Sequence, residues 1–143
     1  MISKTSMFIG SLLAATHPWI IGGCLSPNTV TVNLVNGADH PVDVTLFYDD
    51  NQYITEELLE EVGRERQSRV QPGETASFSD DCNSLQAIFI QKAELSIVGT
   101  IGPSNSSRVY RDGSDFGCGD TITFTFTQNL LGTELSIAYS QRN

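Results

Sequence analysis

Acidic side chains gather around two of the three cysteines of this 143-residue chain. The carboxylates near Cys82 and Cys118 belong to Asp80, Asp81, Asp112, Asp115 and Asp120. If the two cysteines are joined, these carboxylates would converge, and oxygen-rich clusters can hold Ca²⁺, which takes about six to eight oxygen ligands. The spacing matches no EF-hand, however, and Asp-Gly pairs are typical of solvated turns. We therefore predict turns with no metal and no cofactor, and keep a calcium-stabilised domain as an alternative.

Histidine is the usual general base of hydrolases, and His40 is the one histidine beyond residue 23. It lies in a Gly-Ala-Asp-His-Pro turn. The sequence contains no Gly-x-Ser-x-Gly nucleophile elbow, no pair of histidines at metal-ligand spacing and no glycine-rich phosphate loop. We therefore expect a protein that is not an enzyme, and a small hydrolase built on His40 is the alternative.

Residues 1–23 differ in composition from the rest of the chain. Lys4 is their one charged residue, residues 8–23 are mostly apolar, and all 17 acidic residues come later. A short positive segment, an apolar segment and small residues at its end are typical of an export signal. The apolar stretch is shorter than the roughly 20 residues that cross a bilayer, and it is interrupted by His17 and Pro18. The sequence therefore predicts a signal peptide at 1–23.

This segment ends in Ile21-Gly22-Gly23-Cys24, which resembles the lipobox of bacterial lipoproteins, where an aliphatic residue and two small residues precede a cysteine. The resemblance implies that Cys24 receives a diacylglyceryl group, that the chain is cut before it, and that the new amino terminus is acylated, for example with palmitate. Each buried CH₂ of such chains contributes about 0.8 kcal/mol of membrane affinity. Ordinary cleavage that leaves Cys24 as a thiol is the alternative.

The resemblance also implies an address in the cell envelope, on a membrane surface. Leu25 stands where Gram-negative lipoproteins retained at the inner membrane carry Asp, so the outer membrane is favoured if such a membrane exists. Residues 24–28 would be a lipidated tether and residues 29–143 the folded domain. In an exported protein, Cys82 and Cys118 are natural disulfide partners. Their bridge would stabilise the fold by about 3–4 kcal/mol in the chain-entropy account.

The charge balance excludes one class of partner. The chain has 17 acidic and 8 basic residues, for a formal net charge of −9, and loss of Lys4 with the signal changes this to −10. Such a chain lacks the clustered Lys and Arg that nucleic-acid binding requires. Anionic lipid head groups would also repel it, so a covalent anchor is what would hold it at a membrane.

Alternation of apolar and polar residues predicts strands through most of the mature chain. In 121–127, Ile122, Phe124 and Phe126 share one face and four threonines share the other, as in a half-buried strand. The other segments with strand character are 30–34, 42–48, 76–78, 86–91, 95–98, 108–111 and 135–139. The continuous apolar run 87–90 predicts a central strand covered on both sides.

Turn and helix signals separate these strands. Gln71-Pro72-Gly73-Glu74 predicts a type II turn, and Asn36-Gly37 and Gly102-Pro103 predict further turns. Residues 55–62 predict one short helix, capped by Thr55, with Ile54 packed on Leu59. We expect the helix carboxylates to be solvated, although the arginines at 64, 66 and 69 could pair with them.

These elements predict an all-β antiparallel sandwich of about seven or eight strands, immunoglobulin-like or transthyretin-like, with one short helix. The chain also resembles the small, uncharacterised lipoproteins that certain bacteria encode, a resemblance that implies no activity. We expect a non-enzymatic binding or assembly module that contacts an envelope protein or a surface polymer through loops or an edge strand.

Overall fold

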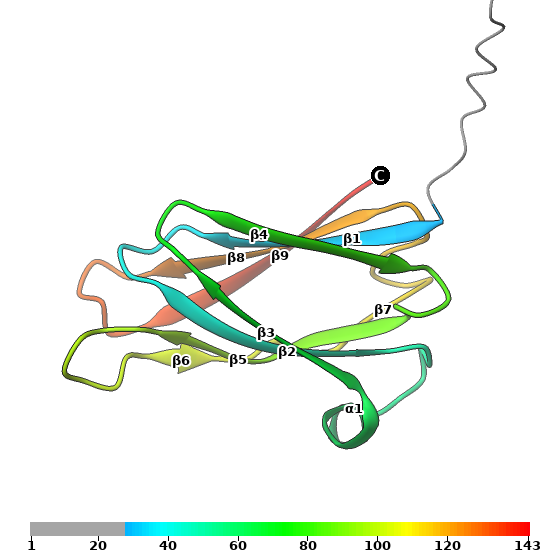
Figure 1. Ribbon diagram of the computed structural model, residues 1–143, viewed down its shortest axis with the longest axis horizontal. Coiled ribbons are helices and arrows are strands. Elements are labelled where there is room, and N and C mark those ends of the chain that lie inside the picture. The colour runs from blue at the N-terminus through cyan, green and yellow to red at the C-terminus, as the bar shows by residue number, and fades with distance from the viewer. Residues whose placement is uncertain (1–27) are drawn as a thin grey trace, which may run out of the picture.

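The structure is a computed structural model that describes residues 28–143. Within them the chain forms two packed β-sheets and one short helix, the all-β sandwich that the sequence predicts (Figure 1). The predicted signal peptide, the lipidation site Cys24 and all of the tether except Asn28 lie outside the described residues.

The first sheet, sheet A, has four strands and contains the first and last strands of the domain. Its order is β4 (Thr75–Asp81), β1 (Thr29–Asn36), β8 (Thr121–Gln128) and β9 (Leu135–Arg142). β1 runs parallel to β8, while the β1–β4 and β8–β9 pairs are antiparallel. The predicted alternation is confirmed in β8, where Ile122, Phe124 and Phe126 are fully buried and the threonines point outward.

The second sheet, sheet B, is antiparallel. Its order is β3 (Arg64–Val70), β2 (Val42–Asp49), β5 (Ala87–Leu95) and β6 (Ser104–Asn105), and β7 (Tyr110–Arg111) also pairs with β5. Sheets A and B bury one large hydrophobic core between them, in which Phe124, Leu34, Leu46 and Ile90 are completely inaccessible. Every long strand therefore contributes to the core, although β3 does so only through Val70 at its end.

The helix α1 (Glu56–Val62) covers the outer face of sheet B (Figure 1). The Thr55 side chain accepts a hydrogen bond from the backbone N–H of Leu58, as predicted for the cap. Leu59 and Ile54 form a second buried cluster with Ala87 and Phe89 of β5. This explains why residues 87–90 are all buried: the main core covers one face of the strand and the helix covers the other.

The two ends of the sandwich differ in what they carry. At the N-terminal end, β1 begins beside the last residues of β4. At the opposite end, called the distal end here, lie the connections 37–41, 71–74, 96–103 and 129–134 (Figure 1). The predicted type II turn is found there, with Gly73 at φ +74° and a hydrogen bond from Glu74 N–H to the Gln71 carbonyl. Glycine suits this left-handed backbone conformation because it has no Cβ atom.

The structure differs from the sequence analysis in several local features. Residues 64–70 form β3, a strand that the sequence does not suggest. The apolar segment at 95–98 is not a strand, because β5 ends at Leu95 and a loop follows. Only the last part of 108–111 forms a strand, as β7. The arginines after the helix do not pair with its carboxylates, because β3 carries them away along β2: Arg64 pairs with Asp80 at 3.5 Å and Arg69 with Asp43 at 3.0 Å.

Candidate functional site

Cys82 and Cys118 are joined by a disulfide at the N-terminal end, with Cα atoms 5.3 Å apart. Cys82 directly follows β4, and its N–H donates to the carbonyl of Asn28 at 3.0 Å. Gly119, on the other side, donates its N–H to the carbonyl of Thr29 at 3.1 Å. The bridge therefore spans the start of β1 and links the end of β4 to the segment before β8.

Two carboxylates beside this disulfide accept hydrogen bonds from backbone N–H groups close to them in the sequence. Asp81 accepts a hydrogen bond from the N–H of Asn83 at 2.8 Å through its side chain. Asp80 accepts from the N–H of Asp81 at 2.8 Å and faces the Arg64 guanidinium. The Asp81 arrangement is that of an Asx turn, in which the side chain accepts from the N–H two residues later, and Asp80 likewise satisfies a neighbouring backbone N–H.

Two further carboxylates are bound within the second loop. Asp120 accepts from the N–H of Gly117 at 2.6 Å and from the side-chain amide of Gln141 at 2.7 Å. Asp115 accepts from the N–H of Arg111 at 2.8 Å and from both terminal nitrogens of Arg108, at 3.1 and 2.6 Å. This bidentate pair is the geometry in which arginine binds carboxylates most strongly.

The expected convergence of five carboxylates does not form. Among residues 28–143, no three His, Cys, Asp or Glu side chains lie in a group that could hold a metal ion. The disulfide brings the two loops together, as predicted, but each loop turns its carboxylates onto its own backbone or onto an arginine. Asp112 takes part through its backbone, donating its N–H to the carbonyl of Gln86 at 2.8 Å.

The Arg108–Asp115 pair belongs to a network that sequence reasoning missed. The hydrogen bonds from Arg108 hold the pKa of Asp115 below its usual value, and burial opposes them. Arg108 also lies over the ring of Tyr110, 4.1 Å from its centroid. Tyr110 in turn stacks on Tyr139 with ring centroids 3.9 Å apart. The Tyr139 hydroxyl donates to the backbone carbonyl of Asp115 at 2.9 Å, which closes the network.

Burial raises the pKa of Tyr139 to about 12, and the negative charge of Asp115 acts in the same direction. Burial also raises the pKa of Tyr110. Both phenols therefore stay protonated at neutral pH, so they act as hydrogen-bond and packing groups rather than as bases. The network connects β7 and the loop after it to β9 and holds one side of the sandwich closed.

His40 lacks the contacts of a catalytic base. Its Nδ1 atom is buried and has no hydrogen-bond partner in the described part of the chain. In a Ser-His-Asp arrangement this nitrogen donates to a carboxylate that orients the ring. The backbone carbonyl of His40 is engaged instead, by the side-chain amide of Asn36 at 2.8 Å. This amide also donates to the carbonyl of Val70 at 2.9 Å, so the buried Asn36 ties the turn to β3.

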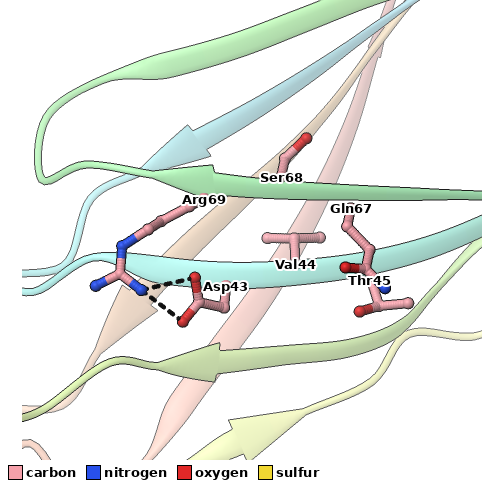
Figure 2. A pocket seen from close by; sticks show the side chains of 6 residues that line it. All are labelled: Asp43, Val44, Thr45, Gln67, Ser68 and Arg69. Atoms are coloured by element: carbon pink, nitrogen blue, oxygen red, sulfur yellow. Dashed lines mark hydrogen bonds and ion pairs between the residues drawn. The ribbon is translucent and has the colours of Figure 1, made fainter.

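An open depression of about 290 Å³ lies on β2 and β3. Figure 2 shows Arg69 reaching across it to Asp43, with one guanidinium nitrogen 3.0 Å from each carboxylate oxygen. Arg69 also donates to the hydroxyl of Ser96 at 3.0 Å. Its charge is thus already paired, and the depression offers a ligand mostly the short polar side chains of Thr45, Gln67 and Ser68.

The distal end carries large aliphatic side chains that almost completely face solvent. They are Val98 and Ile101 in the loop before β6, and Leu130 and Leu131 in the turn before β9, with exposed fractions of 101%, 89%, 106% and 83%. The bases of the two connections meet, because the Asn105 amide donates to the carbonyl of Leu135 at 2.9 Å. A groove of about 440 Å³ lies between them. The sequence does contain a signal for these exposed positions, because Val98, Ile101 and Leu131 each directly precede a glycine.

The part of the chain that the structure describes contains no helix long and apolar enough to cross a membrane. No protein-family model matches the sequence, and no curated protein matches it.

Solved structures show distant likenesses. The type VI secretion lipoprotein TssJ1 of Pseudomonas aeruginosa aligns with 82% of this chain and 99% of its own, at 10% identity and a TM-score of 0.42. The Serratia marcescens protein Lip, a membrane-bound component of the type VI secretion system, aligns with 79% of this chain and 99% of its own, at 9% identity and a TM-score of 0.42. A structure described as a trapped toxin aligns with 80% of this chain but 24% of its own, at 11% identity and a TM-score of 0.42. Likenesses this distant carry no argument about function.

Proposed function

We propose that this chain is an exported, lipid-anchored protein of the bacterial envelope that acts as a non-enzymatic binding or assembly module. The composition of residues 1–23 and the Ile-Gly-Gly-Cys sequence ending at Cys24 support the export and the anchor. The outer membrane is the proposed location where the cell has one, because Leu25 follows the cysteine.

The exposed aliphatic side chains at the distal end are the observation that carries the binding role. Soluble proteins rarely leave several large apolar side chains together in solvent unless a partner covers them. Leu130 and Leu131 come from one connection and Val98 and Ile101 from another, so two separate segments contribute to one end of the domain.

The position of this end fits an anchored module. The described chain begins at the N-terminal end, beside the disulfide, so a tether at residues 24–28 leaves the sandwich there. The connections 96–103 and 129–134, which contain the exposed aliphatic residues, lie at the opposite end (Figure 1). A protein held by lipid at the first end would present the second to components farther from the membrane.

Site-specific photocrosslinking in intact cells tests this proposal. A crosslinking amino acid in place of Leu131 should give a discrete adduct with an envelope component, whereas the same amino acid in place of the exposed Asn83, at the N-terminal end, should not. Equal adduct formation from both positions, or none from Leu131 across several growth conditions, would count against it. For the anchor, the variant Cys24→Ala should leave the membrane fraction and lose the acyl mass; retention of both would refute lipidation.

A further inference from the structure

The strands that border the two sheets differ in how their outer edges are protected. β3 and β4 lie along one side of the sandwich, and β9 and β6 along the other. An unprotected edge strand presents unpaired backbone groups that can pair with another chain, and charged side chains or very short strands normally prevent this. β3 carries three arginines and one glutamate in seven residues, and β6 has only two residues.

The edge of β9 has neither protection. This strand has eight residues, and Arg142 at its end is the one charged residue among them. Its neighbour β8, with the sequence TITFTFTQ, has no charged residue. Much of the acidity lies elsewhere, with four glutamates on the helix that packs on sheet B. Of the carboxylates near β9, Asp115 is paired with Arg108, and Asp120 accepts a hydrogen bond from Gln141. A second chain can therefore approach β9 with less repulsion than at most of the surface.

The hydrogen-bond pattern shows which backbone groups of β9 face away from β8. The turn is closed by the N–H of Asn129, which donates to the carbonyl of Glu134 at 3.2 Å. Along an antiparallel ladder, residue pairs that exchange backbone hydrogen bonds alternate with pairs that do not. Counting from the hydrogen-bonded pair Asn129–Glu134, the residues of β9 that bond to β8 are Ser136 and every second residue after it. The residues whose N–H and C=O groups point outward are Leu135, Ile137, Tyr139 and Gln141.

One independent contact supports this assignment. The carbonyl of Leu135 accepts the Asn105 amide from the other sheet, which places it on the side away from β8. Within residues 28–143, no backbone hydrogen bond outside the β8–β9 ladder reaches Ile137, Tyr139 or Gln141. The outward edge of β9 is thus available to a further strand.

We propose that a second copy of this chain pairs with β9, antiparallel and related by a twofold axis through Ala138. In this register Ile137 lies opposite Tyr139 of the second copy, so the outward groups of both strands bond to each other. Glu134, just before β9, lies opposite Arg142 of the second copy, and this occurs twice because the interface is symmetric. Among registers that use the outward groups, this is the one that places these opposite charges together.

The pairing joins the two four-stranded sheets A into one continuous sheet. The Asn105 contact need not break, because a carbonyl oxygen has two lone pairs and can accept two hydrogen bonds. This inference is independent of the proposed distal binding surface, because the exposed aliphatic side chains of that surface lie outside β9.

Disulfide trapping at the axis tests the register. In a non-bonded antiparallel pair the Cα atoms lie about 4.5 Å apart, within the range that a disulfide spans. In the processed protein purified from envelopes in detergent, Ala138→Cys should therefore form a covalent dimer under mild oxidation. Ser79→Cys, exposed on the opposite edge strand of the same sheet, measures random collision and should react roughly tenfold or more slowly. Equal rates for the two variants would overturn the proposal.

Charge reversal tests the choice of a second copy as the occupant. Glu134→Arg places two arginines opposite each other and Arg142→Glu places two acidic residues together, so each variant should raise the dimer dissociation constant several-fold in sedimentation experiments. The double variant restores opposite charges and should recover the affinity of the unchanged protein. A protein that stays monomeric at all concentrations, a double variant that does not recover, or a β9 that pairs only with a different protein would each overturn the proposal.

Discussion

The two sheets are held together along the two sides of the sandwich by different kinds of contact. On the β3–β4 side, exposed arginines bridge the sheets: Arg66 lies over the ring of Phe78 at 4.2 Å, and Arg64 pairs with Asp80. On the β9–β7 side, the half-buried ring of Tyr139 stacks on Tyr110, and its hydroxyl bonds to a backbone carbonyl. Both sides exclude water from the core, but the first does so with long charged side chains and the second with packed aromatic rings.

This difference between the two sides separates the contacts that stabilise the fold from those that protect an edge strand. Exposed ion pairs contribute about 0–1 kcal/mol each, whereas buried aromatic side chains contribute several times more through packing. We infer that the arginines on the β3 side serve mainly to guard the edge, whereas the aromatic side stabilises the fold and leaves the backbone of β9 without charge protection.

The largest expected effect is on the aromatic side. Tyr139→Ala removes the stacked ring and its contacts with Tyr110 and Phe124, and should lower the free energy of unfolding by about 2–3 kcal/mol. Urea denaturation measures this. The matched control is Tyr53→Ala, because Tyr53 is 83% exposed and should change stability by less than about 0.5 kcal/mol. Similar losses for the two variants would contradict the comparison.

The second prediction removes only the hydroxyl. Tyr139→Phe keeps the ring but leaves the Asp115 carbonyl without its donor, which should cost about 1 kcal/mol at neutral pH.

This variant also tests the pH dependence on the alkaline side. Because burial raises the pKa of Tyr139 from 10.0 to about 12, the unfolded chain loses this proton first as the pH rises. The stability is therefore full below pH 10.0 and falls as the pH rises toward about 12. Denaturation curves in this range should decline less steeply for Tyr139→Phe; an unchanged slope would show that another group controls the decline.

The third prediction concerns the carboxylate of the same network. The pKa of Asp115 is lowered from 3.8 by its hydrogen bonds from Arg108. The stabilisation is present above 3.8 and is lost as the pH falls through the lowered value. Asp115→Asn should therefore be less stable than the unchanged protein at pH 7, and the difference should shrink on acidification. A difference that stays constant down to strongly acidic pH would exclude this role for the charge.

The smallest effect is expected on the arginine side. Arg66→Ala removes the guanidinium above Phe78 and should cost about 0.5–1 kcal/mol. Added salt should leave most of this loss in place, because stacking on the ring persists when charges are screened. Arg64→Ala should lose a larger share of its smaller effect, because its exposed ion pair with Asp80 is screened and its contact with the Tyr48 ring is longer, at 5.8 Å. A loss on Arg66→Ala as large as that on Tyr139→Ala would show that both sides stabilise the fold equally.

The strands with apolar inward faces could be predicted from the sequence, because alternation is a local pattern. β1, β2 and β8 bury every second residue, and each lies where the sequence places it. The turn at Pro72-Gly73 and the cap at Thr55 are also local, since their chemistry is complete within a few residues.

β3 could not be predicted in this way. Its inward positions include Arg64 and Arg66, and their partners Asp80 and Phe78 lie on β4, in the other sheet. An arginine can occupy an inward position when a carboxylate or an aromatic ring from another strand lies beside it. The local sequence pattern does not show which residues of other strands will be there. For the same reason, the sequence leaves open whether these arginines pair with the helix carboxylates.

For the candidate site, the disulfide could be predicted from the sequence, but the directions of the aspartate side chains could not. The pairing of Cys82 with Cys118 follows from counting cysteines in an exported chain. Whether a carboxylate faces its neighbours or its own backbone depends on turn geometry. Asp120 bonds to the N–H of Gly117 three residues before it, which turns it away from the other loop.

The disulfide across the start of β1 has a mechanical consequence. A protein tethered at residue 28 and bound at its distal end would be under tension along β1, between β4 and β8. Such a pull shears all of the hydrogen bonds on both sides of β1 together, instead of opening them one after another. The bridge from Cys82 to Cys118 keeps the two flanking strands from separating at the point of entry. The domain is thereby reinforced against a tensile load where the chain enters it.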